Sequence, residues 1–467
     1  MGGRNLFIRG HSPPACGEAD HGLDALVARL RRQPVETEIR IGGSGWAGLG
    51  VSSVIMAFVP GHRRRESQDK PTVNEENQDM QFDWTSEQDD IRREVRALCA
   101  RFGDAYWLEQ ERRHEFPEEF YRAMAEGGWL GIAMPEEYGG SGMGITEAAL
   151  LLQEVAASGG CMAACSSIHM NIFGVNPLVV HGSEAQKREH LPGIINGETK
   201  VAFGVTEPDV GLDTTRLKTR AVKENGHYRV NGHKIWISTA QVAHKILLLA
   251  RTKPIEETER PADGISLFFT DLNREAIDVR EIEKAGRAAV DSNELFIEDL
   301  IIPEADLIGE EGRGFHYVLD GFNPERILTA AEAIGMGKVA LDRATRYAKE
   351  RIVFGRPIGQ NQAVQHPLAR CWADLEAANL LTFKAAWLYD NGHPCGAEAN
   401  AAKLLGAEMG FKATDQAMQT LGGMGYAKEF HVERYWRESK LLRIAPVSPE
   451  MILCYIAEKV LGLPRSY

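Results

Sequence analysis

The chain lacks the excess of basic residues that nucleic-acid-binding proteins usually carry. Its 467 residues include 53 lysines and arginines against 66 aspartates and glutamates, so its formal net charge is −13. A phosphate-binding surface normally shows as a basic excess or cluster. We therefore expect no nucleic-acid partner. The one basic run, at residues 62–65, lies in an atypical N-terminal region.

Cysteine is also infrequent, with seven residues in the whole chain. An odd number in a chain long enough to bury its own core does not indicate a disulfide framework. We expect a reducing compartment and a cytoplasmic location. Cys161 and Cys165 stand four residues apart, but no histidine or cysteine lies nearby at zinc spacing. Both are interpreted as small buried apolar residues, and no metal is expected.

The N-terminal region shows neither a signal peptide nor a good membrane anchor. Arg4, Arg9 and Glu18 interrupt any apolar stretch of the kind that a signal peptide requires. Residues 41–60 are uncharged and just long enough to span a bilayer, but their glycines make a poor helix. We expect no membrane association.

Three glycines in this region, Gly43, Gly45 and Gly48, satisfy the dinucleotide-binding pattern G-x-G-x-x-G. A second parallel strand should follow, but the next segment is charged and polar, so the required context fails. Residues 1–79 are interpreted as an extension without a defined fold, and one interpretation is that an over-called start codon added it. In that interpretation the native chain begins near Met80.

From Met80 onward the pattern of apolar residues changes twice. Residues 85–196 show helical spacing, residues 200–309 alternate with a period of two, and long amphipathic patterns return after residue 312. Within the alternating part, residues 224–226 (ENG) and Asn231 with Gly232 (NG) predict turns. With 43% hydrophobic residues, the chain can bury two or three cores. The sequence predicts an α+β fold with an N-terminal helical domain (80–199), a middle β-domain (200–312) and a C-terminal domain like a four-helix bundle (313–467).

The segment FGVTEPDVGLD at residues 203–213, followed by KIWIS, combines an indole, hydroxyls and amide-rich turns. Such groups suit a flat, hydrogen-bonding, anionic ligand. This segment resembles the flavin-binding middle part of the FAD-dependent acyl-CoA dehydrogenases. Other segments resemble the same family in the same order along the chain: PEEYGG, RIVFGRPIGQNQ, QTLGGMGY and VERYWRESK. The resemblance extends from Met80 to the C-terminus.

The resemblance implies a flavin site in the middle domain. It places Thr206 and Ser238 at the pyrimidine and N5 edges of the ring, and Trp236 against its face. Leu212 stands where the family usually has serine, so a hydroxyl near the diphosphate and the bound thioester chain is missing. The remaining middle-domain residues expected at the cofactor are Phe203, Val205 and Gly211.

A second set of cofactor residues is implied by the C-terminal segments. An arginine offers diphosphate a fixed fork of donors, and paired glycines let the backbone approach adenosine. In the family these positions reach the FAD of a neighbouring subunit, which implies a homodimer or homotetramer. Read locally, the arginine is equally a helix-end cation and the glycines a helix stop. The expected residues are Arg351, Phe354, Gln362, Gln419, Gly422, Gly423, Ser448 and Glu450.

The catalytic base of the family is a glutamate in one of two places. Pro446 occupies the later of them and cannot serve. The earlier one reads FNPER, in which Asn323 is predicted as the N-cap, Pro324 as N1 and Glu325 as the base. An acidic residue in a first helical turn is also expected from the helix dipole alone. Glu450 is the alternative base, and Asn323 and Arg326 are expected to border the substrate channel with Leu212.

The implied function is α,β-dehydrogenation of an acyl-CoA thioester to the trans-2-enoyl-CoA. The base removes the α-proton, the β-hydride passes to the flavin, and the electrons pass to an electron-transfer flavoprotein. One alternative is an oxidase on the same scaffold, which would use O₂. A second is a flavin- or acyl-CoA-binding protein that lost catalysis with the glutamate at position 446. Acyl length and branching cannot be read from the sequence.

Overall fold

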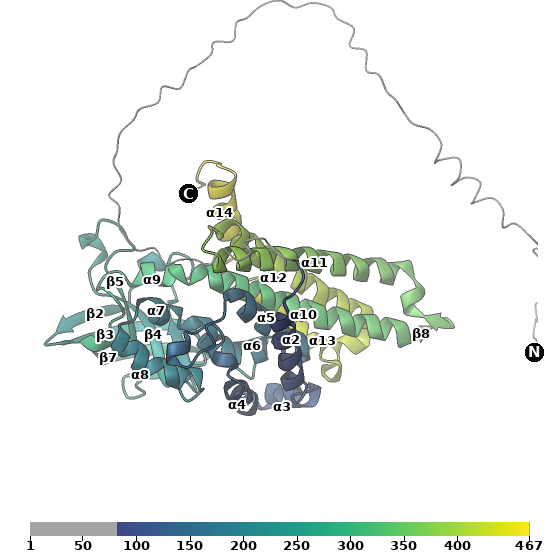
Figure 1. Ribbon diagram of the computed structural model, residues 1–467, viewed down its shortest axis with the longest axis horizontal. Coiled ribbons are helices and arrows are strands. Elements are labelled where there is room, and N and C mark those ends of the chain that lie inside the picture. The colour runs from purple at the N-terminus through teal and green to yellow at the C-terminus, as the bar shows by residue number, and fades with distance from the viewer. Residues whose placement is uncertain (1–81, 467) are drawn as a thin grey trace, which may run out of the picture. The chain divides into compact units, whose positions relative to one another are not determined.

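A computed structural model describes residues 82–466 (Figure 1). Helices occupy residues 86–195, strands residues 201–303, and helices return from residue 314. The predicted α+β order of helical, β and helical parts is therefore confirmed. The expectations for residues 1–79, including the glycine pattern and the start at Met80, concern residues outside those described.

The N-terminal part is helical, and its first helix begins at a capping box. Thr85 Oγ1 accepts from the amide of Gln88 at 3.2 Å, and Gln88 Oε1 accepts from the amide of Thr85 at 3.1 Å. The run Ile145–His181 is long and apolar enough to cross a membrane, but 89% of its most apolar window is buried within the protein. The helices are α2 (Ser86–Cys99), α3 (Asp104–Arg113), α4 (Glu118–Glu126), α5 (Ile145–Val155), α6 (Cys161–His169), α7 (Asn176–His181) and α8 (Glu184–Ile195).

The middle part is a seven-stranded sheet in the order β1, β4, β2, β3, β7, β6, with β5 also paired to β4. The turn predicted at residues 224–226 is present, because Asn225 and Gly226 have φ of 47° and 82° between β2 and β3. The strands are β1 (Val201–Gly204), β2 (Arg220–Glu224), β3 (His227–Ser238), β4 (Lys245–Arg251), β5 (Ile265–Asp271), β6 (Ile277–Glu281) and β7 (Ser292–Pro303).

A second turn, predicted at Asn231 and Gly232, is wrong. Strand β3 runs straight through both residues, with only a shift of register between Val230 and Gly232. A Cβ at Gly232 would lie 2.2 Å from Thr219 Oγ1. Glycine is therefore needed here for the close approach of a neighbouring segment, and not for a turn.

The C-terminal part contains three long helices, α10 to α12, and each runs antiparallel to the one before it. An added Cβ at Gly410 would lie 2.4 Å from the carbonyl oxygen of Ala333, so α10 and α12 pack in close contact. A two-residue hairpin, β8 (Ile352–Val353) and β9 (Arg356–Pro357), joins α10 to α11. The helices are α9 (Gly314–Asp320), α10 (Phe322–Glu350), α11 (Gln362–Asp390), α12 (Gly396–Leu421), α13 (Val432–Leu442) and α14 (Pro449–Tyr455).

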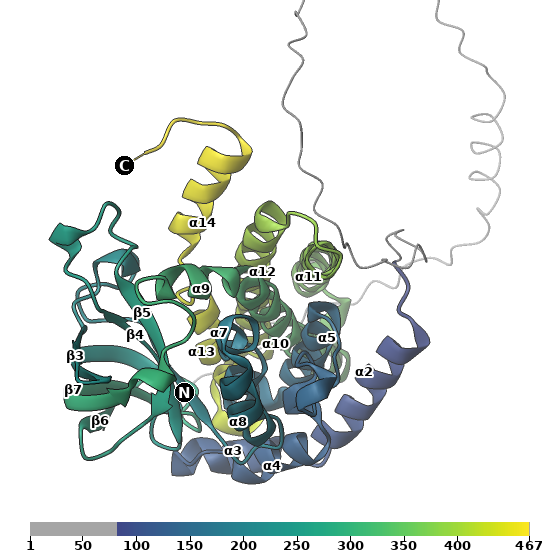
Figure 2. The same ribbon diagram turned by 60° about the vertical axis from the view of Figure 1, so that its left-hand side comes forward.

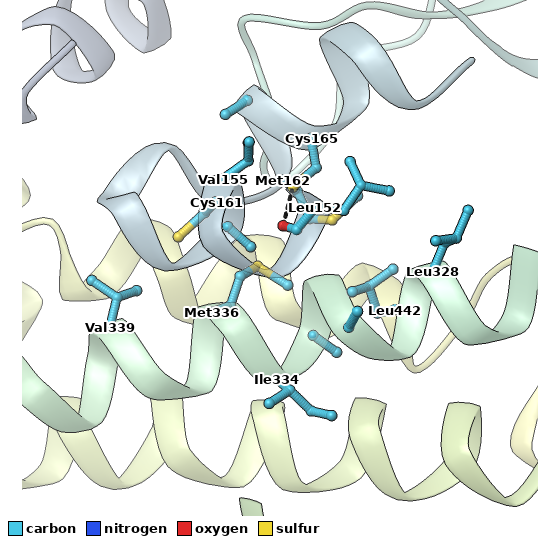
Figure 3. Packing of buried hydrophobic residues seen from close by; sticks show 14 of the residues in the cluster. Leu152, Val155, Cys161, Met162, Cys165, Leu328, Ile334, Met336, Val339 and Leu442 are labelled. Atoms are coloured by element: carbon cyan, nitrogen blue, oxygen red, sulfur yellow. Dashed lines mark hydrogen bonds between the residues drawn. The ribbon is translucent and has the colours of Figure 1, made fainter. Parts of the chain in front are cut away.

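The two helical parts share one hydrophobic core, although the β-domain separates them in the sequence. Figure 3 shows α6 lying across α10, with Met162 and Cys165 above Leu328 and Met336. Figure 2 shows the sheet beside this helical body, with α9 between β5 and the bundle. The start of α10 therefore lies close to the β-domain, which positions the candidate site.

Candidate active site

A β-bulge near the end of β3 exposes Trp236. The pairing of β3 with β7 shifts register between Lys234 and Ile237, and Trp236 has a positive φ of 63°. A bulge re-aims the side chain that it carries. The indole is 56% exposed, whereas Ile237 beside it is 2% exposed. Trp236 thus presents an aromatic wall on an otherwise well-packed strand.

The same bulge brings the segment after β1 to β3. The amide of Ile235 donates to the carbonyl oxygen of Thr206 at 2.9 Å. Ser238 ends the strand two residues beyond Trp236. The sheet therefore gathers Thr206, Trp236 and Ser238 in one place. The other residues expected beside the ring pack against the hydrophobic cluster of this segment: Phe203 and Val205.

A buried ion pair holds the loop that follows. Lys234 Nζ lies 2.9 Å from Glu207 Oε1, and both side chains are buried. Glu207 also accepts from the amides of Lys218 at 2.6 Å and Thr219 at 2.9 Å. Burial lowers the pKa of Lys234 to about 8, although Glu207 opposes this shift. The pair therefore fixes both ends of the loop that carries Gly211 and Leu212.

Gly211 and Leu212 lie at the open side of this loop. Leu212 is 61% exposed, and a Cβ at Gly211 would meet no atom within 4 Å. The backbone here is accessible to a ligand.

Behind Ser238 lies a buried arginine that the sequence did not single out. Arg287 donates to Ser238 Oγ at 3.1 Å and to Ser292 Oγ at 2.6 Å, and its other terminal nitrogen donates to Ser166 Oγ at 3.0 Å. A hydroxyl has one proton and accepts through its oxygen. Because the oxygen of Ser238 accepts from Arg287, its proton is available to a ligand acceptor.

The start of α10 differs from the predicted cap. The helix begins at Phe322 with Gly321 as its N-cap, so Asn323 and Pro324 lie inside the first turn. Gly321 has helical angles and joins α9 to α10, and its carbonyl oxygen accepts from the amide of Glu325 at 3.1 Å. Asn323 instead accepts from Arg326 at 3.2 Å. The predicted roles of Asn323 as N-cap and Pro324 as N1 are therefore wrong. The backbone amide of Glu325 already donates to Gly321, so it is not a free donor at the start of the helix.

Glu325 is partly buried between α10 and its neighbours. Burial raises the pKa of its carboxyl group to about 7, Glu332 adds to the shift, and Arg326 and Lys403 oppose it. Lys403, buried on α12, donates to the carbonyl oxygen of Val447 at 2.5 Å. Val447 directly follows Pro446. Lys403 therefore acts electrostatically on Glu325 and also holds the backbone next to Pro446, the other position at which a base was sought.

The second set of predicted cofactor residues lies at the other end of the bundle (Figure 1). Helix α10 rises about 1.5 Å per residue, so Arg351 at its C-cap lies roughly 40 Å from Glu325. Phe354, at the tip of the β8–β9 hairpin, is 100% exposed. Because α11 runs back and α12 runs out again, further predicted residues share this end: Gln362, Gln419, Gly422 and Gly423. The chain does not bring them to Trp236.

Ser448 and Glu450 begin α14. Ser448 Oγ accepts from the amide of Met451 at 3.3 Å and so caps the helix. Glu450 is exposed, and its own backbone amide and the Ser448 side chain hold the pKa of its carboxyl group below the usual range. A solvated carboxylate of this kind is a weaker proton acceptor than Glu325.

The residues present fit FAD. The exposed indole of Trp236 offers a wall for the ring, and the proton of Ser238 is available to a ring acceptor. Sequence reasoning missed Arg287, Lys403 and the Glu207–Lys234 pair. In the sequence, these residues stand out only as charged side chains within segments whose apolar pattern predicts burial.

Comparison with known proteins identifies the domains of one family along the described chain. The N-terminal, middle and C-terminal domain profiles of acyl-CoA dehydrogenases match residues 85–198, 202–300 and 312–461. The chain is 37% identical to acyl-CoA dehydrogenase FadE12 of Mycobacterium tuberculosis over 395 residues, which cover 83% of this chain and 100% of that protein.

Two solved structures are similar along most of the chain. The complex of glutaryl-coenzyme A dehydrogenase with glutaryl-CoA superimposes with a TM-score of 0.79 at 31% identity, covering 83% of this chain and 98% of that one. A chain from a structure described as the electron transferring flavoprotein of Acidaminococcus fermentans gives a TM-score of 0.77 at 30% identity, covering 82% and 100%. The protein belongs to the acyl-CoA dehydrogenase family of FAD-dependent oxidoreductases.

Proposed function

We propose that the chain catalyses α,β-dehydrogenation of an acyl-CoA thioester to the trans-2-enoyl-CoA, with Glu325 as the base. The observation that carries this proposal is the place of Glu325, partly buried in the first turn of α10 beside Arg326, and burial there raises the pKa of its carboxyl group to about 7. General-base catalysis is most effective when the pKa of the base lies near the working pH. Glu450, the alternative base, is exposed and has a lowered pKa.

The chain supplies binding and proton transfer. Glu325 takes the α-proton of the thioester, and Arg326 and Lys403 limit how far its pKa rises. Trp236 and Ser238 hold the ring of FAD, which supplies the acceptor for the β-hydride when it is bound. Asn323, Arg326 and the exposed Leu212 border the CoA side of the substrate.

We also propose that each FAD site is completed by a second subunit. Arg351 lies roughly 40 Å from Glu325 along α10. Phe354 is fully exposed, and a second subunit that covered its aromatic ring would remove that apolar surface from water. A homodimer or homotetramer brings the Arg351 end of one chain to the flavin site of another.

Electron transfer to a flavoprotein partner is part of the proposal. It is supported by the likeness to the chain from the Acidaminococcus fermentans electron transferring flavoprotein structure.

A cytoplasmic location is also part of the proposal. Free thiols on the six described cysteines agree with a reducing compartment such as the cytoplasm.

Anaerobic mixing of the purified yellow protein with acyl-CoA thioesters tests the reaction. We expect the flavin absorbance to bleach with at least one thioester in the wild type and to persist in Glu325→Gln. Rapid O₂ consumption without an added acceptor would favour an oxidase. A flavin that no thioester bleaches would favour a binding protein without catalysis.

A further inference from the structure

An open groove runs between α10 and α11, which lie side by side in the helical body (Figure 1). Its volume is about 580 Å³. Trp372 is 61% exposed beside it, whereas Leu368 and Leu375 on the same helix are buried. Tryptophan is enriched at protein–protein interfaces and depleted on free surfaces. The apolar lining of the groove is Leu341, Ala348, Leu368, Ala369, Trp372 and Leu375.

The apolar surface continues along α11 beyond the groove. Trp372, Leu380 and Phe383 share one face of the helix by their spacing. Leu380 is 56% exposed. Trp84 packs edge-on against Phe383, with ring centroids 4.7 Å apart. The chain therefore covers one end of this face itself and leaves Trp372 and Leu380 open to solvent.

The charges around the groove are balanced. At one end Lys338 lies 3.9 Å from Glu376, and Asp342 beside it pairs with Arg346 at 2.8 Å. Lys349, towards the other end, is exposed and has no ion-pair partner among residues 82–466. A groove with charges of one sign would repel its own copy, whereas a lining with two lysines and two acids can match itself.

Antiparallel pairing with a copy of the groove gives Lys349 a partner. In a contact across a two-fold axis, residue i meets residue j and j meets i. Lys349 stands about 16 Å along α10 from Lys338, and Glu376 is level with Lys338. Trp372 lies near the middle of this span. In the antiparallel arrangement the two Trp372 rings pack near the axis, and each Lys349 faces the partner's Glu376.

This contact differs from the one proposed to complete the flavin site. The groove is lined by α10, α11 and Gly359, and by no residue of α12. The second set of predicted cofactor residues, in contrast, includes Gln419, Gly422 and Gly423 at the end of α12. Gly359 follows the β8–β9 hairpin, so the two surfaces are adjacent. Two different self-complementary faces on one chain build a tetramer from two dimers.

We propose that the α10–α11 groove pairs with the same groove of a second copy of this chain and joins two flavin-sharing dimers into a homotetramer. The inference rests on the shared flavin site proposed above, which supplies the other interface. Balanced charge, the unpaired Lys349 and the adjacent hairpin favour a second copy over a different partner.

Sedimentation velocity of the holoenzyme tests the role of Trp372. We expect a tetramer in the wild type and a dimer in Trp372→Glu, because a charge on each side of the axis opposes burial of the groove. The dissociation constant of the tetramer should rise at least roughly tenfold. FAD content and flavin reduction should stay as in the wild type. Ile301→Glu is the matched control, since Ile301 is 47% exposed on β7 and should leave the tetramer intact.

A charge exchange tests the antiparallel arrangement. Lys349→Glu should weaken the tetramer by roughly threefold to tenfold. Adding Glu376→Lys should restore much of the loss. Within one chain these two side chains stand about 16 Å apart along the groove, so restoration reports a contact between copies.

The outcomes separate this interface from the proposed reaction. A wild-type dimer, or a tetramer that persists in both Trp372→Glu and Lys349→Glu, would overturn the groove interface and leave the dehydrogenation intact. Loss of FAD together with assembly in Trp372→Glu would also overturn it, because the groove and the flavin contact would then be one interface. Bleaching by acyl-CoA thioesters tests the dehydrogenation independently.

Discussion

Glu325 and Arg351 stand at opposite ends of one helix, roughly 40 Å apart. The first is proposed to touch the substrate and the second the cofactor. A single straight helix cannot bring both ends to one ligand. With these proposed roles, the flavin near Glu325 would receive its Arg351 from another chain, in agreement with the proposed homo-oligomer.

Arg351→Ala should weaken FAD binding and subunit association together, because the guanidinium is expected to reach diphosphate across an interface. Flavin content and sedimentation velocity measure both. Arg346→Ala is the matched control, since Arg346 lies on the same helix and pairs with Asp342 of its own chain at 2.8 Å. A monomer that retains its full FAD content would contradict a shared site.

Glu325→Gln should reduce the rate of flavin reduction by roughly 10² to 10⁴, the usual contribution of a positioned base. FAD content and ligand-induced spectral shifts should persist, because the amide keeps the shape of the side chain. In the wild type the rate should rise with pH and level off above about 7, where the carboxyl group is ionised. Stopped-flow absorbance follows each of these. A large loss in Glu450→Gln with a normal rate in Glu325→Gln would place the base after Pro446.

The same carboxyl group should make stability depend on pH. Its pKa is raised in the folded chain from the usual 4.5 to about 7, so the folded state binds this proton more tightly than the unfolded state. Its contribution to stability is therefore greatest below pH 4.5 and declines as the pH rises to about 7. Glu325→Gln should gain stability relative to the wild type across this window, by up to about 3 kcal/mol. Urea unfolding at several pH values measures the difference.

The order of helical and β segments was predictable, because apolar periodicity reports burial of one face of each element. Predictions from neighbouring residues alone were wrong where a segment distant in the sequence determines the local structure. Asn231 and Gly232 read as a turn, but Gly232 is required by the approach of Thr219. Asn323 and Pro324 read as a helix start, but α9 leads into α10 through Gly321.

Buried polar contacts were the least predictable part of the site. His169 and Glu332, whose side chains lie 3.1 Å apart, are separated by 163 positions in the sequence, and Arg287 and Ser166 by 121. Nothing in a single sequence states which buried charges meet across such distances. The bulge at Trp236 was equally hidden, since it depends on the pairing of β3 with β7.

Lys234→Met should destabilise the protein by about 3 to 5 kcal/mol, because it leaves Glu207 buried without its cation. Looser attachment of the loop at Gly211 should also lower FAD affinity. Denaturant unfolding and flavin titration report the two effects. The double variant Lys234→Met/Glu207→Leu should recover much of the stability, since it removes both charges. No loss in the single variant would show that the pair does not hold the loop.

Arg287→Met should lower the reduction potential of bound FAD. Hydride transfer adds negative charge to the ring, and a fixed, buried cation next to Ser238 stabilises that charge. We expect at least a tenfold change in the two-electron equilibrium, which corresponds to about 30 mV. Arg251→Met is the control, because Arg251 is buried in the same domain but donates to loop carbonyls such as that of Thr215 at 2.6 Å. If Arg287 acts through the hydroxyl of Ser238, its effect should shrink in a Ser238→Ala background. An unchanged potential in Arg287→Met with normal FAD content would leave the arginine a purely structural role, joining α6 to the sheet.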